Sequence, residues 1–168
     1  MVILIMPKEN EDLDLKYHEK MAKGCFNQTW DLIDKKDRSS EEEINMIHTA
    51  HASRYHWGIL VSKGKGTPLN LQRSEWQIAR VYTILQRAEP ALYHARVCLG
   101  LTEEHNIGDF DLGFAYEAMA RASALSKNKD DFKKYFKLAQ EAGEKIAKKD
   151  DRDYFFEDLN GGQWFGMK

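Results

Sequence analysis

The sequence predicts an all-α fold built from antiparallel helical hairpins. Apolar residues recur three and four positions apart over most of the chain, and no segment alternates for long enough to indicate a β-sheet. Only three prolines occur, and Pro68 and Pro90 stand at predicted helix starts, where proline is tolerated. The breaks between predicted helices are a few residues long, which favours antiparallel packing of consecutive helices.

The composition indicates one soluble, globular helical domain over residues 1–168. A chain of this length with 42% hydrophobic and 31% charged residues can bury a core of its own. A net charge of −2 argues against a nucleic acid as the main partner, because phosphate binding needs a concentrated basic surface. Cys25 and Cys98 form no Cys-x-x-Cys spacing, and we expect both to be reduced thiols in a cytoplasmic protein.

The first eleven residues are expected to form a flexible N-terminus. The apolar run from Val2 to Met6 is too short to span a membrane, and it lacks the basic region and cleavage site of a signal peptide. Either Met1 or Met6 can be the true start. No membrane partner is therefore expected.

The predicted helices follow from apolar spacing and capping signals. The first extends from Asp12 to Asp37, with apolar residues at helical spacing. Ser39 and the acidic residues after it predict the N-cap of the second helix, which continues to about Val61. The remaining helices of the hairpin region 12–147 are expected at residues 69–87, 90–105, 110–125 and 131–146, followed by a C-terminal helix and apolar tail in 148–168.

The segment from His48 to Trp57 has the most unusual composition in the chain. It places three of the six histidines, one arginine and two aromatic residues on one predicted helix. At about 100° per residue, His48 and His51 fall among apolar residues, so both are expected to face inward or into a groove. His56 points elsewhere and is expected to be exposed.

Further polar residues occupy apolar surfaces of the later helices. His94 lies on the apolar side of its helix, while Glu117 and Arg121 are four positions apart and are expected to pair, because a lone buried charge is costly. If the hairpins curve, these polar residues can line one concave surface. The predicted ligand- or partner-binding residues are His48, His51, Tyr55, Arg73, Trp76, Arg80, His94, Glu117 and Arg121.

Residues 80–99 resemble a tetratricopeptide repeat. Tyr82 takes the aromatic position of the first helix, and Ala91, Ala95 and Cys98 take the small-residue positions of the second. A poorer second match begins at Tyr116 and continues through Phe132 and Ala139. The resemblance implies a short right-handed, tetratricopeptide-like solenoid over about residues 70–147.

The stretch from His48 to Arg121 is also similar to uncharacterised prokaryotic proteins of tetratricopeptide-like fold, which carries no known activity across. The first functional hypothesis is a non-enzymatic protein- or peptide-binding or scaffold module, with no catalytic residue and no cofactor. Its apolar tail, with Trp164 and Phe165 after a Gly-Gly hinge, is expected to cap the chain's own last helix. Alternatively, the tail enters a neighbouring subunit and forms a homodimer.

Two other functional classes stay open. The first is a divalent transition-metal site or metalloenzyme with His48, His51 and His94 as ligands, because helical bundles build metal sites from facing helices. The second is a site for a small anionic ligand. Its residues would be the arginines, which bind carboxylate and phosphate in bidentate fashion: Arg54, Arg73, Arg80 and Arg121.

Overall fold

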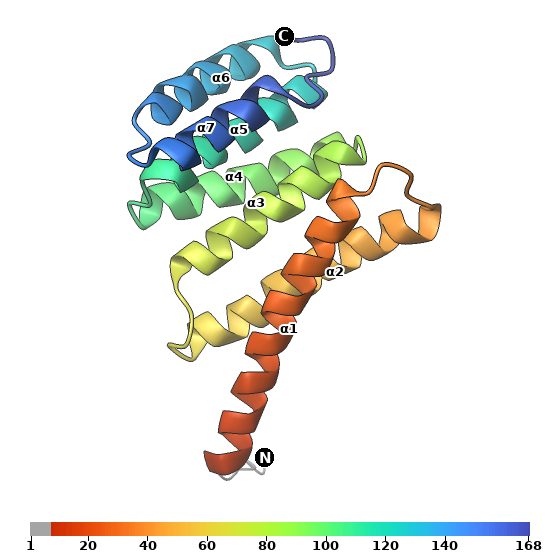
Figure 1. Cartoon of the computed structure of the whole chain (residues 1–168), viewed down its shortest axis with the longest axis vertical. Coiled ribbons are helices and arrows are strands. Elements are labelled where there is room, and N and C mark those ends of the chain that lie inside the picture. The colour runs from red at the N-terminus through yellow and green to blue at the C-terminus, as the bar shows by residue number, and fades with distance from the viewer. Residues whose placement is uncertain (1–7) are drawn as a thin grey trace. The chain divides into compact units, whose positions relative to one another are not determined.

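The computed structural model of the chain describes residues 8–168, with side chains from Asp12 onward. These residues form seven α-helices and contain no β-strand, which confirms the predicted all-α class (Figure 1). The chain divides into two compact units, Met1–Thr67 and Pro68–Lys168. The apolar run from Val2 to Met6 lies outside the described residues. Within the described part of the chain, no helix is both long and apolar enough to cross a membrane.

The first unit is a hairpin of α1 (Lys8–Asp34) and α2 (Ser40–Ser62). Ser39 caps α2 as predicted: its hydroxyl oxygen accepts from the Glu42 backbone N–H at 3.3 Å, and a Glu42 carboxylate oxygen accepts from the Ser39 N–H at 2.9 Å. This reciprocal pair satisfies two donors that a helix start leaves unbonded.

Small side chains line the contact between α1 and α2. Ala22 and Ala50 are fully buried, and the Ser53 hydroxyl donates to the Ala22 carbonyl oxygen at 2.8 Å. A hydrogen bond from one helix to the backbone of the other requires close approach of the two helices. Met46 and Leu60 fill the rest of this side of α2.

The second unit contains five helices, and consecutive helices pack against each other along α3 to α6. α3 also packs on α5, and α7 packs on both α5 and α6 (Figure 1). α5 thus contacts every other helix of the unit, which explains its composition of alanine and other small or apolar residues. The helices are α3 (Pro68–Ile84), α4 (Ala88–Glu104), α5 (Asp109–Leu125), α6 (Lys129–Glu144) and α7 (Lys149–Asn160).

The small residues of α4 are buried. Ala91, Ala95 and Cys98 are fully inaccessible to solvent. Burial raises the pKa of the Cys98 thiol far above its ordinary range, so this cysteine stays protonated and behaves as a small apolar side chain. α4 begins at Ala88, two residues before the predicted start at Pro90. Proline is tolerated at this place because the N–H groups in the first turn of a helix have no partner within the helix.

Phe155 of α7 is the largest fully buried side chain of the second unit. Its ring meets Phe114 edge to face at 5.0 Å. Gly113 and Gly143 lie beneath it, and a methyl group at either position would come within 3.2 Å of its ring carbons. The two glycines therefore make room for α7 on α5 and α6.

The same turn closes α3, α4 and α5. Gln86, Asn106 and Lys127 each have a positive φ of 51° to 59°. The residue after each of them donates its N–H to a carbonyl five positions earlier, at 2.8, 2.9 and 3.0 Å respectively. This is the Schellman arrangement, and here it reverses the chain without glycine.

Candidate functional site

A buried ion cluster joins α3, α5 and α7 in the second unit. At its centre is Glu117, which is 1% exposed. Its carboxylate accepts hydrogen bonds from Trp76 Nε1 at 3.2 Å, from Arg80 Nη1 at 3.1 Å and from Arg121 Nε. The predicted pairing of Glu117 with Arg121 along α5 is confirmed.

Asp158 of α7 closes the cluster from the other side. Its carboxylate pairs with Arg80 Nη2 and lies 3.6 Å from Arg121 Nη2. Its backbone carbonyl also accepts from Arg121 Nη2 at 2.7 Å. Two arginines thus face two carboxylates, and their formal charges cancel.

The two carboxylates of the cluster differ in their pKa. Burial alone would raise the pKa of Glu117, but Arg80 and Arg121 outweigh it and lower that pKa below the ordinary value. Burial, followed by repulsion from Glu117, raises the pKa of Asp158 despite the same two arginines. Glu117 is therefore the firmly ionised partner of the two arginines.

Arg121 also holds the C-terminal tail. Its Nη1 donates to the Gln163 carbonyl at 3.3 Å, and its guanidinium carbon lies 4.2 Å from the centre of the Trp164 ring. Gly162 has a φ of +70°, and a methyl group there would lie 2.7 Å from Arg121 Nη1. Only glycine combines this backbone angle with this close approach.

The tail docks on its own unit. Trp164 is 6% exposed and packs against Phe132 and Phe136 of α6, with ring centroids 5.7 and 5.0 Å away. The tail also touches the end of α7, where Lys168 Nζ donates to the Asn160 carbonyl at 3.2 Å. The tail was expected to cap the chain's own last helix; it contacts the end of α7, and its tryptophan also packs on α6.

His94 and Arg73 each bind a carboxylate outside the buried ion cluster. His94 Nδ1 lies 2.7 Å from Glu75 Oε2, and the Tyr82 ring stacks on the imidazole at 5.8 Å. Arg73 binds both oxygens of Asp111, at 2.7 and 2.9 Å. All six predicted site residues of this unit are thus held in place by other parts of the same unit.

His48, His51 and Tyr55 belong to the first unit. Tyr55 is 65% exposed, His48 is exposed, and His51 is half-buried. His56 is also half-buried, with its Nδ1 atom 2.6 Å from Nδ1 of His18. His48 was expected to face inward or into a groove, and His56 was expected to be exposed. The structure leaves His48 exposed and half-buries His56, because α2 packs on α1 through the side that carries Met46, Ala50 and Ser53.

The predicted metal and anion sites place their residues on separate units. His94 belongs to the second unit, whereas His48 and His51 belong to the first. Among the side chains that the structure describes, from Asp12 onward, no group of three or more histidine, cysteine, aspartate or glutamate residues is arranged to hold a metal ion. Arg73, Arg80 and Arg121 each pair with a carboxylate, so an anionic ligand would have to displace it.

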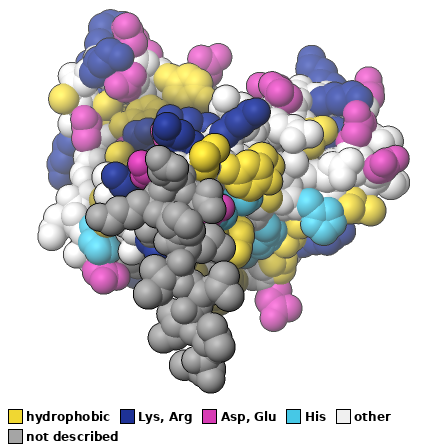
Figure 2. Space-filling view, turned by 90° about the horizontal axis from the view of Figure 1, so that it is seen from below, with side chains coloured by type: hydrophobic (Ala, Val, Ile, Leu, Met, Phe, Trp, Pro, Cys, Tyr) yellow, Lys and Arg dark blue, Asp and Glu magenta, His cyan; other side chains and the backbone are white. Residues whose placement is uncertain are grey.

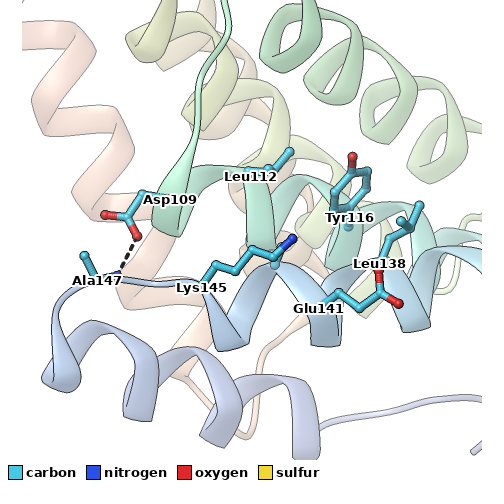
Figure 3. Close-up of a pocket in the computed structure, with 8 residues that line it drawn as sticks. Asp109, Leu112, Tyr116, Leu138, Glu141, Lys145 and Ala147 are labelled. Carbon is cyan, nitrogen blue, oxygen red and sulfur yellow. Dashed lines mark hydrogen bonds between the residues drawn. The ribbon is translucent and has the colours of Figure 1, made fainter.

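A pocket of about 530 Å³ opens between α5, α6 and the connection from α6 to α7 (Figure 3). Asp109 Oδ1 accepts a hydrogen bond from the Ala147 N–H at 3.0 Å, which ties that connection to the start of α5. The lining combines an apolar part with a charged part. It consists of Leu112, Tyr116, Leu138, Ala142 and Ala147 together with Asp109, Glu141 and Lys145.

No protein-family model, no curated protein and no solved structure matches the chain at a significant level.

The residues that line the pocket were not among the predicted site residues. Their spacing is visible in the sequence: Leu112 and Tyr116 are four positions apart on α5, and Leu138 and Ala142 are four positions apart on α6. That spacing shows only that each pair shares a face of its helix. It does not show that the two faces leave a space between them.

Proposed function

We propose that this chain is a helical-repeat module that binds a peptide segment of a partner protein. The observation that carries this proposal is the pocket of about 530 Å³ between α5 and α6, with apolar walls and charged residues beside them. The buried ion cluster is less suited to a ligand, because its arginines and carboxylates already neutralise one another.

Internal repetition supports a tetratricopeptide-like arrangement of the second unit. The hairpin of α3 and α4 is followed by the hairpin of α5 and α6, and α3 packs on α5. Gln86 and Lys127 form the same turn 41 residues apart, and the buried residues Ala91 and Phe132 have the same offset. We place these hairpins in a short right-handed solenoid, an architecture that presents extended binding surfaces.

The lining of the pocket indicates which kind of peptide fits. Leu112, Tyr116 and Leu138 offer an apolar surface for one or two buried side chains, and binding energy concentrates at such anchors. Lys145 can pair with an acidic residue of the peptide, while Glu141 favours a basic one. The partner segment is therefore an apolar anchor flanked by charges.

Selection of peptides from a displayed library on the full chain tests this function. Selected peptides are synthesised, and their dissociation constants are measured by fluorescence anisotropy. Tyr116→Ala should weaken binding about tenfold or more through loss of an apolar wall. Tyr93→Ala is the matched control, because Tyr93 is an exposed tyrosine of α4 that does not line the pocket.

A second pair of variants tests the charged rim. Lys145→Glu should weaken acidic peptides in a salt-dependent way. Lys133→Glu makes the same change at an exposed position of α6 away from the pocket. The proposal fails if no peptide is selected, or if pocket and control variants have the same effect.

A further inference from the structure

Two histidines of the first unit face each other across the helical hairpin. His18 of α1 and His56 of α2 place their Nδ1 atoms 2.6 Å apart, and their ring centroids lie 4.9 Å apart. This distance fits a hydrogen bond in which one neutral ring donates its Nδ1 proton to the lone pair of the other. A metal ion can take the place of that proton where the two rings move slightly apart.

We propose that His18 and His56 form a two-histidine site for a divalent transition metal ion of the Zn²⁺, Ni²⁺ or Cu²⁺ class, which joins α1 to α2. Metal–nitrogen bonds of about 2.0–2.1 Å place neighbouring ligand nitrogens roughly 2.9–3.3 Å apart. The two rings need to separate by less than about 1 Å to reach this spacing. Water completes the coordination shell.

Asp14 orients His18 for this role. Its Oδ1 atom lies 3.6 Å from His18 Nε2, one helical turn away on α1. A carboxylate at this nitrogen favours the tautomer that carries its proton on Nε2, which leaves the Nδ1 lone pair directed at His56. Ligand histidines in metalloproteins commonly have such a carboxylate behind them.

His56 is available as the second ligand. Its Nδ1 atom lies 2.6 Å from Nδ1 of His18, on the side of the ring that faces α1. In the metal-free pair, His56 donates its Nδ1 proton to His18. When the metal binds, that proton moves through solvent to Nε2 of His56, so both rings stay neutral and no net proton is released.

Two tyrosines flank the histidine pair at the surface. The Tyr17 ring meets the His56 ring edge-on at 6.0 Å, and the Tyr55 ring meets it at 5.4 Å. The tyrosines are 55% and 65% exposed, so water ligands and an incoming ion can reach the site. Figure 2 shows histidine side chains exposed beside hydrophobic ones on the face that it presents.

Titration of the full, chelator-treated chain with Zn²⁺, Ni²⁺ or Cu²⁺ alone tests the site. Calorimetry should give one ion per chain, and His18→Ala and His56→Ala should each weaken its binding at least tenfold. Asp14→Asn should weaken it about tenfold, as expected for the loss of a carboxylate behind a ligand. His48→Ala and His105→Ala replace exposed histidines elsewhere and should leave it unchanged.

A second readout keeps the test independent of folding. Circular dichroism checks that each variant is folded, with His18→Gln and His56→Gln as milder replacements. Nitrogen-15 spectra of the wild type should show the ion on the Nδ1 atoms. The ion should also raise the melting temperature of the wild type but not of these variants.

Three outcomes would overturn the site. If no ion binds, the pair is a hydrogen bond only. If His48→Ala removes binding and His18→Ala does not, the ion lies elsewhere on α2. If Nε2 rather than Nδ1 responds, the geometry is wrong. None of these outcomes bears on peptide binding by the second unit, because the probe is the metal alone.

Discussion

At the residue scale, buried charge is the costliest feature of the second unit. Glu117 is ionised inside a helical core, which is tolerable only because Trp76, Arg80 and Arg121 all donate to it. Removing one partner of such a cluster leaves the others buried without full compensation.

Glu117→Gln should therefore destabilise the protein by about 3–5 kcal/mol, because Arg80 and Arg121 then share Asp158 as their only carboxylate. Urea unfolding followed by circular dichroism gives this value. Glu103→Gln, at an exposed position of α4, should change stability by less than about 0.5 kcal/mol. Equal effects of the two variants would contradict the role given to the cluster.

A second prediction at this scale concerns helical glycines. Gly143→Ala would place a methyl group 2.9 Å from Phe156 Cζ and closer still to the Phe155 ring, so it should cost about 1–3 kcal/mol. Gly100→Ala has open space near the C-terminal end of α4 and should stabilise by about 0.5–1 kcal/mol. Melting temperatures that move in the same direction for both variants would refute this packing.

At the element scale, the C-terminal tail packs on the second unit and joins α5, α6 and α7. Arg121 binds its backbone, and Trp164 fills the surface beside Phe132 and Phe136. A homodimer through Trp164 and Phe165 remains a prediction. Such a dimer would require Trp164 to leave this position, because it is buried within its own chain.

Trp164→Ala should destabilise the second unit by about 3–5 kcal/mol through loss of a buried aromatic side chain. Hydrogen exchange should quicken at the end of α7, where the tail docks. Tyr93→Ala removes an exposed aromatic ring and should have a small effect. Sedimentation at several concentrations shows whether Trp164→Ala changes the oligomeric state, as the tail-mediated dimer requires.

The hairpin of α1 and α2 should respond to pH through His56. Burial and then His18 lower its pKa from 6.5, so the unfolded chain takes up a proton at a higher pH than the folded hairpin does. The contribution of His56 to the stability of the hairpin is therefore fully present above about pH 6.5 and is lost as the pH falls below that value.

Amide exchange of α1 and α2 measured against pH checks this direction. His56→Gln should reduce the dependence, whereas His48→Gln should preserve it, because His48 is exposed. If the protection of these amides from exchange increases as the pH falls below about 6.5, the prediction is contradicted.

At the scale of the whole molecule, the second unit has its own core and a closed ion cluster. Ile78, Phe155 and Leu159 are almost fully buried, and all four members of the cluster lie in residues 68–168. A fragment of residues 68–168 should therefore fold alone, with a helical spectrum and one cooperative unfolding transition. A broad, non-cooperative transition would show that it depends on the first unit.

Unfolding of the full chain tests the predicted single domain over residues 1–168. Trp30 and Trp57 report on the first unit, and Trp76 and Trp164 report on the second. Single-tryptophan variants that unfold together would support one domain. Separate transitions would show that the hairpin of α1 and α2 is an independent folding unit.

The sequence by itself determined the features that depend on neighbours within one or two helical turns. Helical periodicity, the N-cap at Ser39 and the pairing of Glu117 with Arg121 all follow from local spacing. The same reasoning failed for His48 and His56, since it could not tell which side of α2 packs on α1.

Only the tertiary structure decided which distant residues meet. Asp158 joins Arg80 across 78 positions, and His18 meets His56 across 38. The pocket between α5 and α6 likewise depends on how far apart two packed helices stand. Periodicity fixes the faces of each helix, but partners and spaces depend on how all the side chains between the helices fit together, and that is a property of the packed whole.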